Sequence, residues 1–189
     1  MTIWMAFITL LCVGCQAEPE SHGGHALDLI DPQPIWLDDE LHFSTSLIWR
    51  PDEAVVEALH HGVVIPLELS VRISRHHGVV ASEDRRHDHR FEIRYLPLLQ
   101  DYELWDVRAD QRARYPRLSI LNRALAQRRR FSAGLTQSEV EERRWQVQLR
   151  AHLDLSRLPS PMRLPVWFDP SWRSEAPWRS FVFPAEGAE

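Results

Sequence analysis

Lysine is absent from this chain of 189 residues, whose 22 basic side chains are all arginine. The absence excludes mechanisms that need an ε-amine, such as Schiff-base catalysis, a Ser-Lys dyad or the lysine of a P-loop. The net charge is -5 and the pI is near 6.1, so the chain as a whole has no positive field for nucleic acid or an anionic lipid surface. We therefore expect no nucleic-acid partner.

Cysteine is nearly absent too: Cys12 lies within an N-terminal apolar run, and Cys15 lies just after it. The run covers residues 3–13 and is too short to span a bilayer, which needs about twenty residues, but it suits the apolar region of a signal peptide. If the signal is removed before Cys15, Cys12 leaves with it, and if Cys15 carries a lipid, no free thiol remains. Disulfides, a cysteine nucleophile and cysteine-ligated zinc are then excluded, and the hydrophobic core must hold the fold.

The segment Leu11–Cys15 resembles a bacterial lipobox, in which a cysteine is acylated and becomes the mature N-terminus. Cys15 is the candidate lipidation site. We expect a signal peptide over 1–14, a flexible tether over 15–25, a single domain over 26–184 and a disordered tail over 185–189. This predicts a periplasmic protein, lipid-anchored to the inner or outer membrane of a Gram-negative bacterium; signal-anchored and secreted forms stay open.

Apolar and polar side chains alternate over 145–155, 63–73 and 41–49, which predicts three strands with one wet face each. Further strands are expected over 91–95 and 102–107. We expect residues 63–77 and 86–95 to pair as a hairpin.

Two short helices are expected between the strands. Pro51 and the acids after it predict a helix over 51–61, ended by Gly62. A second begins at Ser119 and ends near 128–130, where the helix dipole favours arginine. Because residues 156–184 are rich in proline and tryptophan, they favour short edge strands or turns. The expected fold is an all-β antiparallel β-sandwich with two short helices and a Pro/Trp-rich C-terminal segment.

Several stretches, spread over roughly residues 26–184, carry a family resemblance: Arg50–Gly62, Arg94-Tyr95, Tyr102, Leu153–Arg163, Trp172 and Trp178. Together with the order of the expected elements, they resemble a bacterial family, domain of unknown function 4390. The resemblance implies an exported or membrane-anchored protein of proteobacteria and supplies no activity, cofactor or catalytic residue. It also implies a gene beside a membrane sensor kinase of nitrogen regulation, and so an accessory to a membrane signalling or assembly protein.

Histidine is the one reactive residue type that is plentiful, with ten in the chain. His76, His77, His87 and His89 are expected to gather near the tip of the hairpin, with His87 and His89 on one strand face. Neutral imidazoles bind zinc and copper, so one hypothesis is a metal-binding or hydrolytic periplasmic protein built on these four residues. The competing interpretation is a solvated loop.

The chain lacks the motifs Gly-x-Ser-x-Gly, His-Glu-x-x-His and Gly-x-Gly-x-x-Gly. We therefore expect no catalytic residue and no cofactor, and favour a non-enzymatic module that binds another protein of the envelope. Tryptophan and arginine are common in protein interfaces. The candidate interaction surface, in the Pro/Trp-rich segment, consists of Trp172, Arg173, Trp178 and Arg179.

Overall fold

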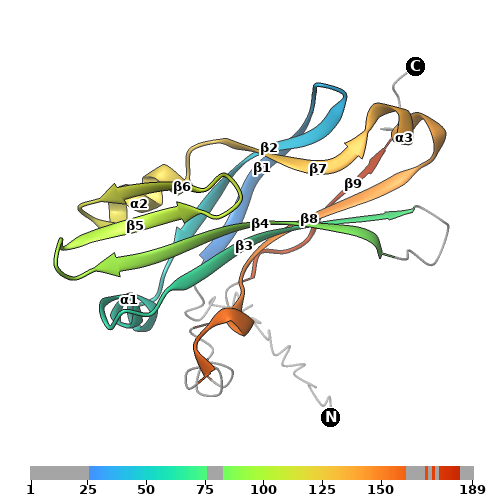
Figure 1. The fold of residues 1–189 in the computed structure, drawn as a ribbon. Helices are drawn as coiled ribbons and strands as arrows, with labels where there is room; N and C mark the ends of the chain where they lie inside the picture. Colours follow the sequence, from blue (N-terminus) through green and yellow to red (C-terminus); the bar gives the residue numbers. More distant parts are fainter. Residues whose placement is uncertain (1–25, 76–82, 161–168, 170–171, 173–174, 184–189) are drawn as a thin grey trace, which may run out of the picture.

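The computed structural model describes residues 26–75, 83–160, 169, 172 and 175–183. These residues form two antiparallel sheets that pack face to face (Figure 1). The expected antiparallel β-sandwich is thereby confirmed. The first sheet has the strand order β1 (Ala26–Leu37), β2 (Glu40–Arg50), β7 (Arg129–Thr136). The second has the order β6 (Gln111–Tyr115), β5 (Asp101–Asp106), β4 (Glu83–Leu96), β3 (Ile65–Arg75), β8 (Trp145–Leu153), β9 (Arg179–Phe183).

The predicted strands are present because their side chains alternate between the core and the outside. On β8 the odd-numbered residues from Trp145 to Leu153 are buried and the even-numbered ones are half-buried. β2 alternates in the same way. β3 differs, because Glu68, Ser70 and Ser74 on its outer side are also buried. The outer side of β3 is therefore not the wet face that the pattern predicted.

The expected helix over 51–61 is α1 (Glu53–His60), and contacts of the flanking residues explain where it begins and ends. The Asp52 side chain accepts a hydrogen bond from the Ala54 amide, which satisfies one free donor of the first turn. Gly62 has φ +85°, a conformation that favours glycine, and it turns the chain into β3. Val55, Ala58 and Leu59 bury one face of the helix.

The second expected helix is α2 (Leu118–Leu125), but both of its ends differ from the prediction. Arg117, not Ser119, is the N-cap, and the helix ends before the arginine run. Arg129 and Arg130 instead begin β7, because the alternating residues after them are buried against β2. A third helix, α3 (Gln137–Glu142), was not expected; Thr136 and Glu139 start it with a capping box.

The core lies between the two sheets and is closed at one edge by the C-terminal segment. Trp49, Phe43 and Phe91 are its largest fully buried side chains. β9 pairs with β8 at the edge of the second sheet, as expected for this segment, and Phe181 stacks 4.8 Å from Phe43. A 3-10 turn follows β8 at Leu155–Arg157. None of the described helices is long and apolar enough to span a bilayer.

Candidate functional site

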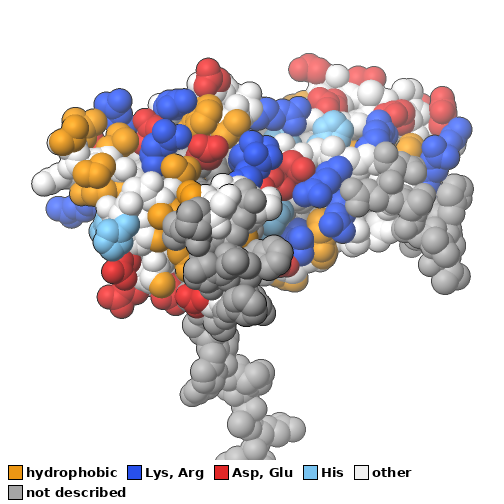
Figure 2. All heavy atoms as spheres, turned by 60° about the horizontal axis from the view of Figure 1, so that its bottom comes forward, with side chains coloured by type: hydrophobic (Ala, Val, Ile, Leu, Met, Phe, Trp, Pro, Cys, Tyr) orange, Lys and Arg blue, Asp and Glu red, His pale blue; other side chains and the backbone are white. Residues whose placement is uncertain are grey.

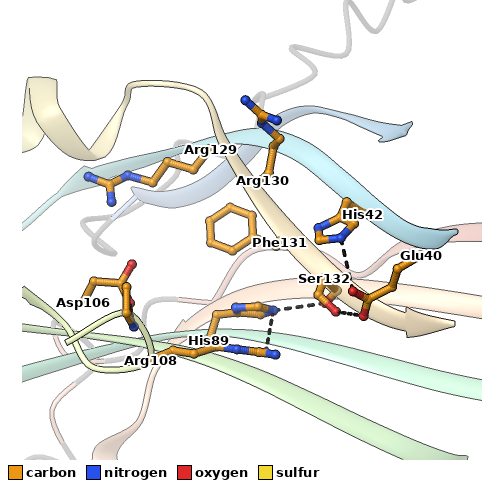
Figure 3. Close-up of a pocket in the computed structure, with 10 residues that line it drawn as sticks. Glu40, His42, His89, Asp106, Arg108, Arg129, Arg130, Phe131 and Ser132 are labelled. Carbon is orange, nitrogen blue, oxygen red and sulfur yellow. Dashed lines mark hydrogen bonds and ion pairs between the residues drawn. The ribbon is translucent and has the colours of Figure 1, made fainter. Parts of the chain in front are cut away.

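A cavity of about 410 Å³ opens between the sheets, where β2 and β7 face β4 and the turn after β5 (Figure 3). Three arginines and two carboxylates line it, with Phe131 in its wall. The arginine heads point in different directions, so they do not converge on one point in the cavity. The cavity is therefore polar but does not form a preorganised anion clamp.

His89 lies at the floor of this cavity with only 7% of its surface exposed. Its Nε2 lies 3.1 Å from the Ser132 carbonyl and 3.5 Å from Arg108 Nη1. Donation to a carbonyl requires the proton on Nε2, and we assign this tautomer because that contact is the shorter. Burial lowers the pKa of His89, and the positive charge of Arg108 lowers it further. The imidazole is therefore neutral at neutral pH.

Ser132 and Glu40 meet across the β2–β7 pair, where the Ser132 hydroxyl donates to the Glu40 carboxylate. This hydrogen bond lowers the pKa of Glu40, and His42 Nε2 lies 3.3 Å from the other carboxylate oxygen. In an acyl-transfer triad the imidazole stands between the hydroxyl and the acid. Here the acid stands between the hydroxyl and the imidazole, so these contacts do not activate Ser132 in that way.

The histidines of the predicted metal site are placed only in part. His87 and His89 share one face of β4, as expected, but this face points inward toward β7. His87 lies so close to Gly134 that an added Cβ would be 2.3 Å from its Nε2. His76 and His77 lie outside the described residues. Within the described part of the chain, no three His, Cys, Asp or Glu side chains gather as a metal site.

The outer face of the second sheet carries a different chemistry. Figure 2 looks at the molecule from this side and shows arginine and carboxylate side chains intermixed along it. On β5, the Trp105 ring lies 4.1 Å from the Arg112 guanidinium and 5.8 Å from that of Arg94. The Trp105 indole N–H donates to Asp110 at 3.1 Å. The Trp105 ring is therefore held in place on both its face and its edge. We name Trp105, Arg94 and Arg112 the Trp105 cluster.

A second cluster of the same kind lies on the same face, over β3 and β8. Trp178 lies 4.3 Å from the Arg72 guanidinium and 4.6 Å from that of Arg150. Glu175 forms an ion pair with Arg150 at 2.6 Å. We name Trp178, Arg72 and Arg150 the Trp178 cluster. The outer face thus presents two tryptophans, each stacked on two arginines.

Charge is not balanced beside the Trp105 cluster. Glu103 is buried and lies 3.5 Å from Arg94, 3.6 Å from Arg112 and 3.9 Å from Arg114. Arg94 also pairs with Glu92 at 3.1 Å. Arg112 and Arg114 therefore share one carboxylate, and their side chains are 46% and 60% exposed. Their remaining N–H donors suit a carboxylate or another anion.

The three described residues of the predicted interaction surface, Trp172, Trp178 and Arg179, do not form one patch. Trp172 is buried in the core, with 5% of its surface exposed, and Arg173 lies outside the described residues. Trp178 belongs to the outer face, whereas Arg179 lies 3.9 Å from Asp28 of β1 on the other side of the sheet. Of the three that the structure describes, only Trp178 contributes to an arginine–tryptophan cluster.

The Trp105 cluster was missed at the sequence level, although a signal for it was present. Glu103 and Trp105 are two positions apart on β5, and Arg112 and Arg114 are two positions apart on β6, so each pair shares one face of its strand. The register, which places Trp105 opposite Arg112, could not be read from the sequence.

The comparisons with known proteins give one match. A family model described as "Domain of unknown function (DUF4390)" matches residues 29–182. No curated protein and no solved structure matches the chain. The match covers nearly all of the described residues, and its description carries no activity.

Proposed function

The chain belongs to the DUF4390 family, and from this premise we propose that it is a non-enzymatic interaction module of the cell envelope. In this proposal the protein is exported and held to a membrane through a lipid on Cys15. Its partner is an acidic protein surface, which binds the outer face of the six-stranded sheet. The module acts as an accessory to a membrane signalling or assembly protein.

The observation that supports this proposal best is the pair of arginine–tryptophan clusters on one face. Tryptophan and arginine are enriched among residues that dominate binding energy, because they combine a large apolar area with fixed polar groups. The rings of Trp105 and Trp178 are already stacked on arginines, so little side-chain freedom is lost when a partner binds. A face that is preorganised in this way suits recognition.

The charge of the face indicates an acidic partner. From Arg86 to Arg114, the outer sides of β4, β5 and β6 carry five arginines against four carboxylates, although the whole chain has a net charge of -5. The arginines are Arg86, Arg90, Arg94, Arg112 and Arg114, and the carboxylates are Asp88, Glu92, Asp101 and Glu103. The most exposed of these charges, on Arg112 and Arg114, favour an acidic surface, and their attraction weakens as salt is added.

Membrane attachment is tested through Cys15. The full chain, expressed in a Gram-negative host, should carry lipid mass and sediment with membranes. Cys15→Ser should lose the lipid mass and either accumulate as precursor or leave the membrane fraction. Unchanged mass and partitioning would favour a signal anchor.

Partner binding is tested by photo-crosslinking, because a chain without lysine offers no side-chain amine to ordinary crosslinkers. A photo-reactive amino acid at Ala109, in the exposed turn beside the Trp105 cluster, should form a protein adduct in native envelopes. The double change Arg112→Glu and Arg114→Glu should remove that adduct. The matched control reverses the exposed Arg143 and Arg144 and should keep it. Equal loss in both variants, or loss in neither, contradicts the proposed surface.

A further inference from the structure

The turn between β4 and β5 presents two leucines to solvent. Leu98 is fully exposed and Leu99 is 53% exposed, whereas the leucines of the core are at most 5% exposed. A backbone hydrogen bond from the Leu99 amide to the Leu96 carbonyl, 3.1 Å long, closes the turn below them. Single exposed leucines are ordinary on protein surfaces, but two adjacent ones at the tip of a hairpin form an apolar projection.

This projection lies in the half of the molecule where the described chain begins. Ala26 pairs with Arg50 at the end of β2, and α1 follows directly and leads into β3. β4 returns along β3 and ends beside α1, where the Tyr95 ring lies 4.7 Å from His60. The β4–β5 turn lies at the left of Figure 1 and α1 at its lower left, and the start of β1 lies on the same half of the sandwich, nearer to its middle.

Other groups at this end add apolar surface without a single sign of charge. β6 also ends here, and α2 follows it with Ile120 41% exposed. Figure 2 shows hydrophobic side chains gathered at this end of the molecule, on its left. Arg117 is exposed nearby, but α1 carries the exposed acids Glu53 and Glu57. Contact made by this end would therefore depend on apolar burial more than on charge.

The segment that precedes Ala26 indicates which surface meets the tip. Eleven residue steps separate Cys15 from Ala26 and can span at most about 40 Å. β4, with 14 residues, is about 46 Å long. Because the chain enters the sandwich at Ala26 and the tether is shorter than β4, a lipid on Cys15 favours orientations in which the half that carries Leu98 and Leu99 is nearer to the bilayer than the end that carries α3.

We propose that Leu98 and Leu99 insert into the interfacial layer of the bilayer that holds the anchor. This inference rests on the proposed lipid attachment at Cys15. The anchor supplies the affinity, and the two leucines add a second, weak contact that fixes the orientation of the domain. The strands then stand on the membrane, and the outer face with its two arginine–tryptophan clusters points sideways, toward a partner in the same membrane.

The test places a photo-reactive amino acid at position 98 of the full chain, in membranes isolated from the expressing cells. Mass spectrometry of the irradiated protein should find phospholipid adducts at this position. The same amino acid at Glu141, exposed on α3 at the opposite end, is the matched control and should give none. High salt should leave the adducts at 98 unchanged, because the contact is apolar.

A second design removes the contribution of the apolar probe itself. The photo-reactive amino acid is placed at Pro97, and Leu98→Asp with Leu99→Asp should then reduce its lipid adducts at least severalfold. Protein adducts in place of lipid adducts at 98, equal lipid adducts at 98 and 141, or no adduct at 98 would each overturn the inference. If the chain sediments with membranes and carries lipid but fails this test, only the contact of Leu98 and Leu99 with the bilayer is contradicted. A chain outside the membrane fraction contradicts the anchor as well.

Discussion

The two faces of β3, the strand that pairs with β8, are almost equally buried, but they are built from opposite chemistry. On the inner side, Leu67, Leu69, Val71 and Leu149 are fully buried among apolar residues. On the outer side, Glu68 is 4% exposed, yet it pairs with Arg86 at 3.1 Å and lies 3.7 Å from His152. Burial on one face is thus apolar packing, and on the other it is an ion-paired network.

The two faces differ in what they can contribute. Apolar burial stabilises roughly in proportion to the area removed from water. A buried ion pair gains little net stability, because desolvation of its charges offsets their attraction, but loss of one partner is costly. The inner face should therefore dominate the stability of the fold, and the outer face should decide what the fold binds.

The largest expected effect is on the inner face. Leu149→Ala should lower the free energy of unfolding by about 2–5 kcal/mol, because it leaves a cavity beside Val71 in a closed core. Gln148→Ala, the neighbouring residue on the outer side, should cost less than about 1 kcal/mol, since it loses one exposed hydrogen bond to Ser180. Urea unfolding of both variants measures the difference. The reverse order would mean that β8 faces the other way.

The next effect measures the outer network. Glu68→Ala should cost about 1–3 kcal/mol, because it removes the acceptor for Arg86 and Ser70 beneath the sheet surface. Glu175→Ala, which breaks an exposed pair with Arg150 on the same face, should cost less than about 1 kcal/mol. If the two variants lose equal stability, the outer network is not buried as described.

A smaller effect depends on pH and comes from one buried histidine on each face. Burial lowers the pKa of His89 on the inner face and of His152 on the outer face, so below the ordinary value of 6.5 the unfolded chain binds more protons than the folded one. The free energy of unfolding should therefore fall as the pH falls from about 7.5 to 5.5, by at most about 1.4 kcal/mol per pH unit for each histidine.

The control for this prediction is a variant that removes no titratable group. His89→Gln should reduce the slope, whereas Gln148→Ala should leave it unchanged. The pKa values of some carboxyls, such as Glu40 and Glu139, are lowered. These groups change the slope of stability against pH only near or below their ordinary pKa of 4.5. A slope that is the same in His89→Gln and in the unaltered protein would show that His89 titrates alike when folded and unfolded.

Strands with one apolar face could be predicted from the sequence, and those with weaker patterns could not. β2 and β8 alternate clearly, so their residues identify them. β7 was missed because its apolar pattern has only three residues, Phe131, Ala133 and Leu135, and because the arginine run before it predicts the end of a helix. β1 is broken by a bulge between Ile30 and Gln33, with prolines on either side of Gln33.

The candidate sites depend on contacts between distant parts of the chain. Ser132 meets Glu40, which lies 92 residues earlier, and Trp178 lies over Arg72. Alternation on β3 correctly placed Glu68 on the outer side. It could not show that residues 175–178 would lie along β8, where the Ala176 amide donates to the Ala151 carbonyl at 2.8 Å. Local pattern predicts which way a side chain points, whereas the fold decides what covers it.

The smallest expected effect on stability should have the largest effect on binding. Trp105→Ala removes a ring stacked on Arg112 on the outer face, and should cost only about 1 kcal/mol. Leu104→Ala, one residue earlier on the inner face, should cost about 2–5 kcal/mol. Urea unfolding gives the two losses. Photo-crosslinking from Ala109, at a temperature where both variants are folded, should show the partner adduct lost in Trp105→Ala and kept in Leu104→Ala. If Trp105→Ala instead keeps the adduct and loses as much stability as Leu104→Ala, the outer face supports the fold and the partner binds elsewhere.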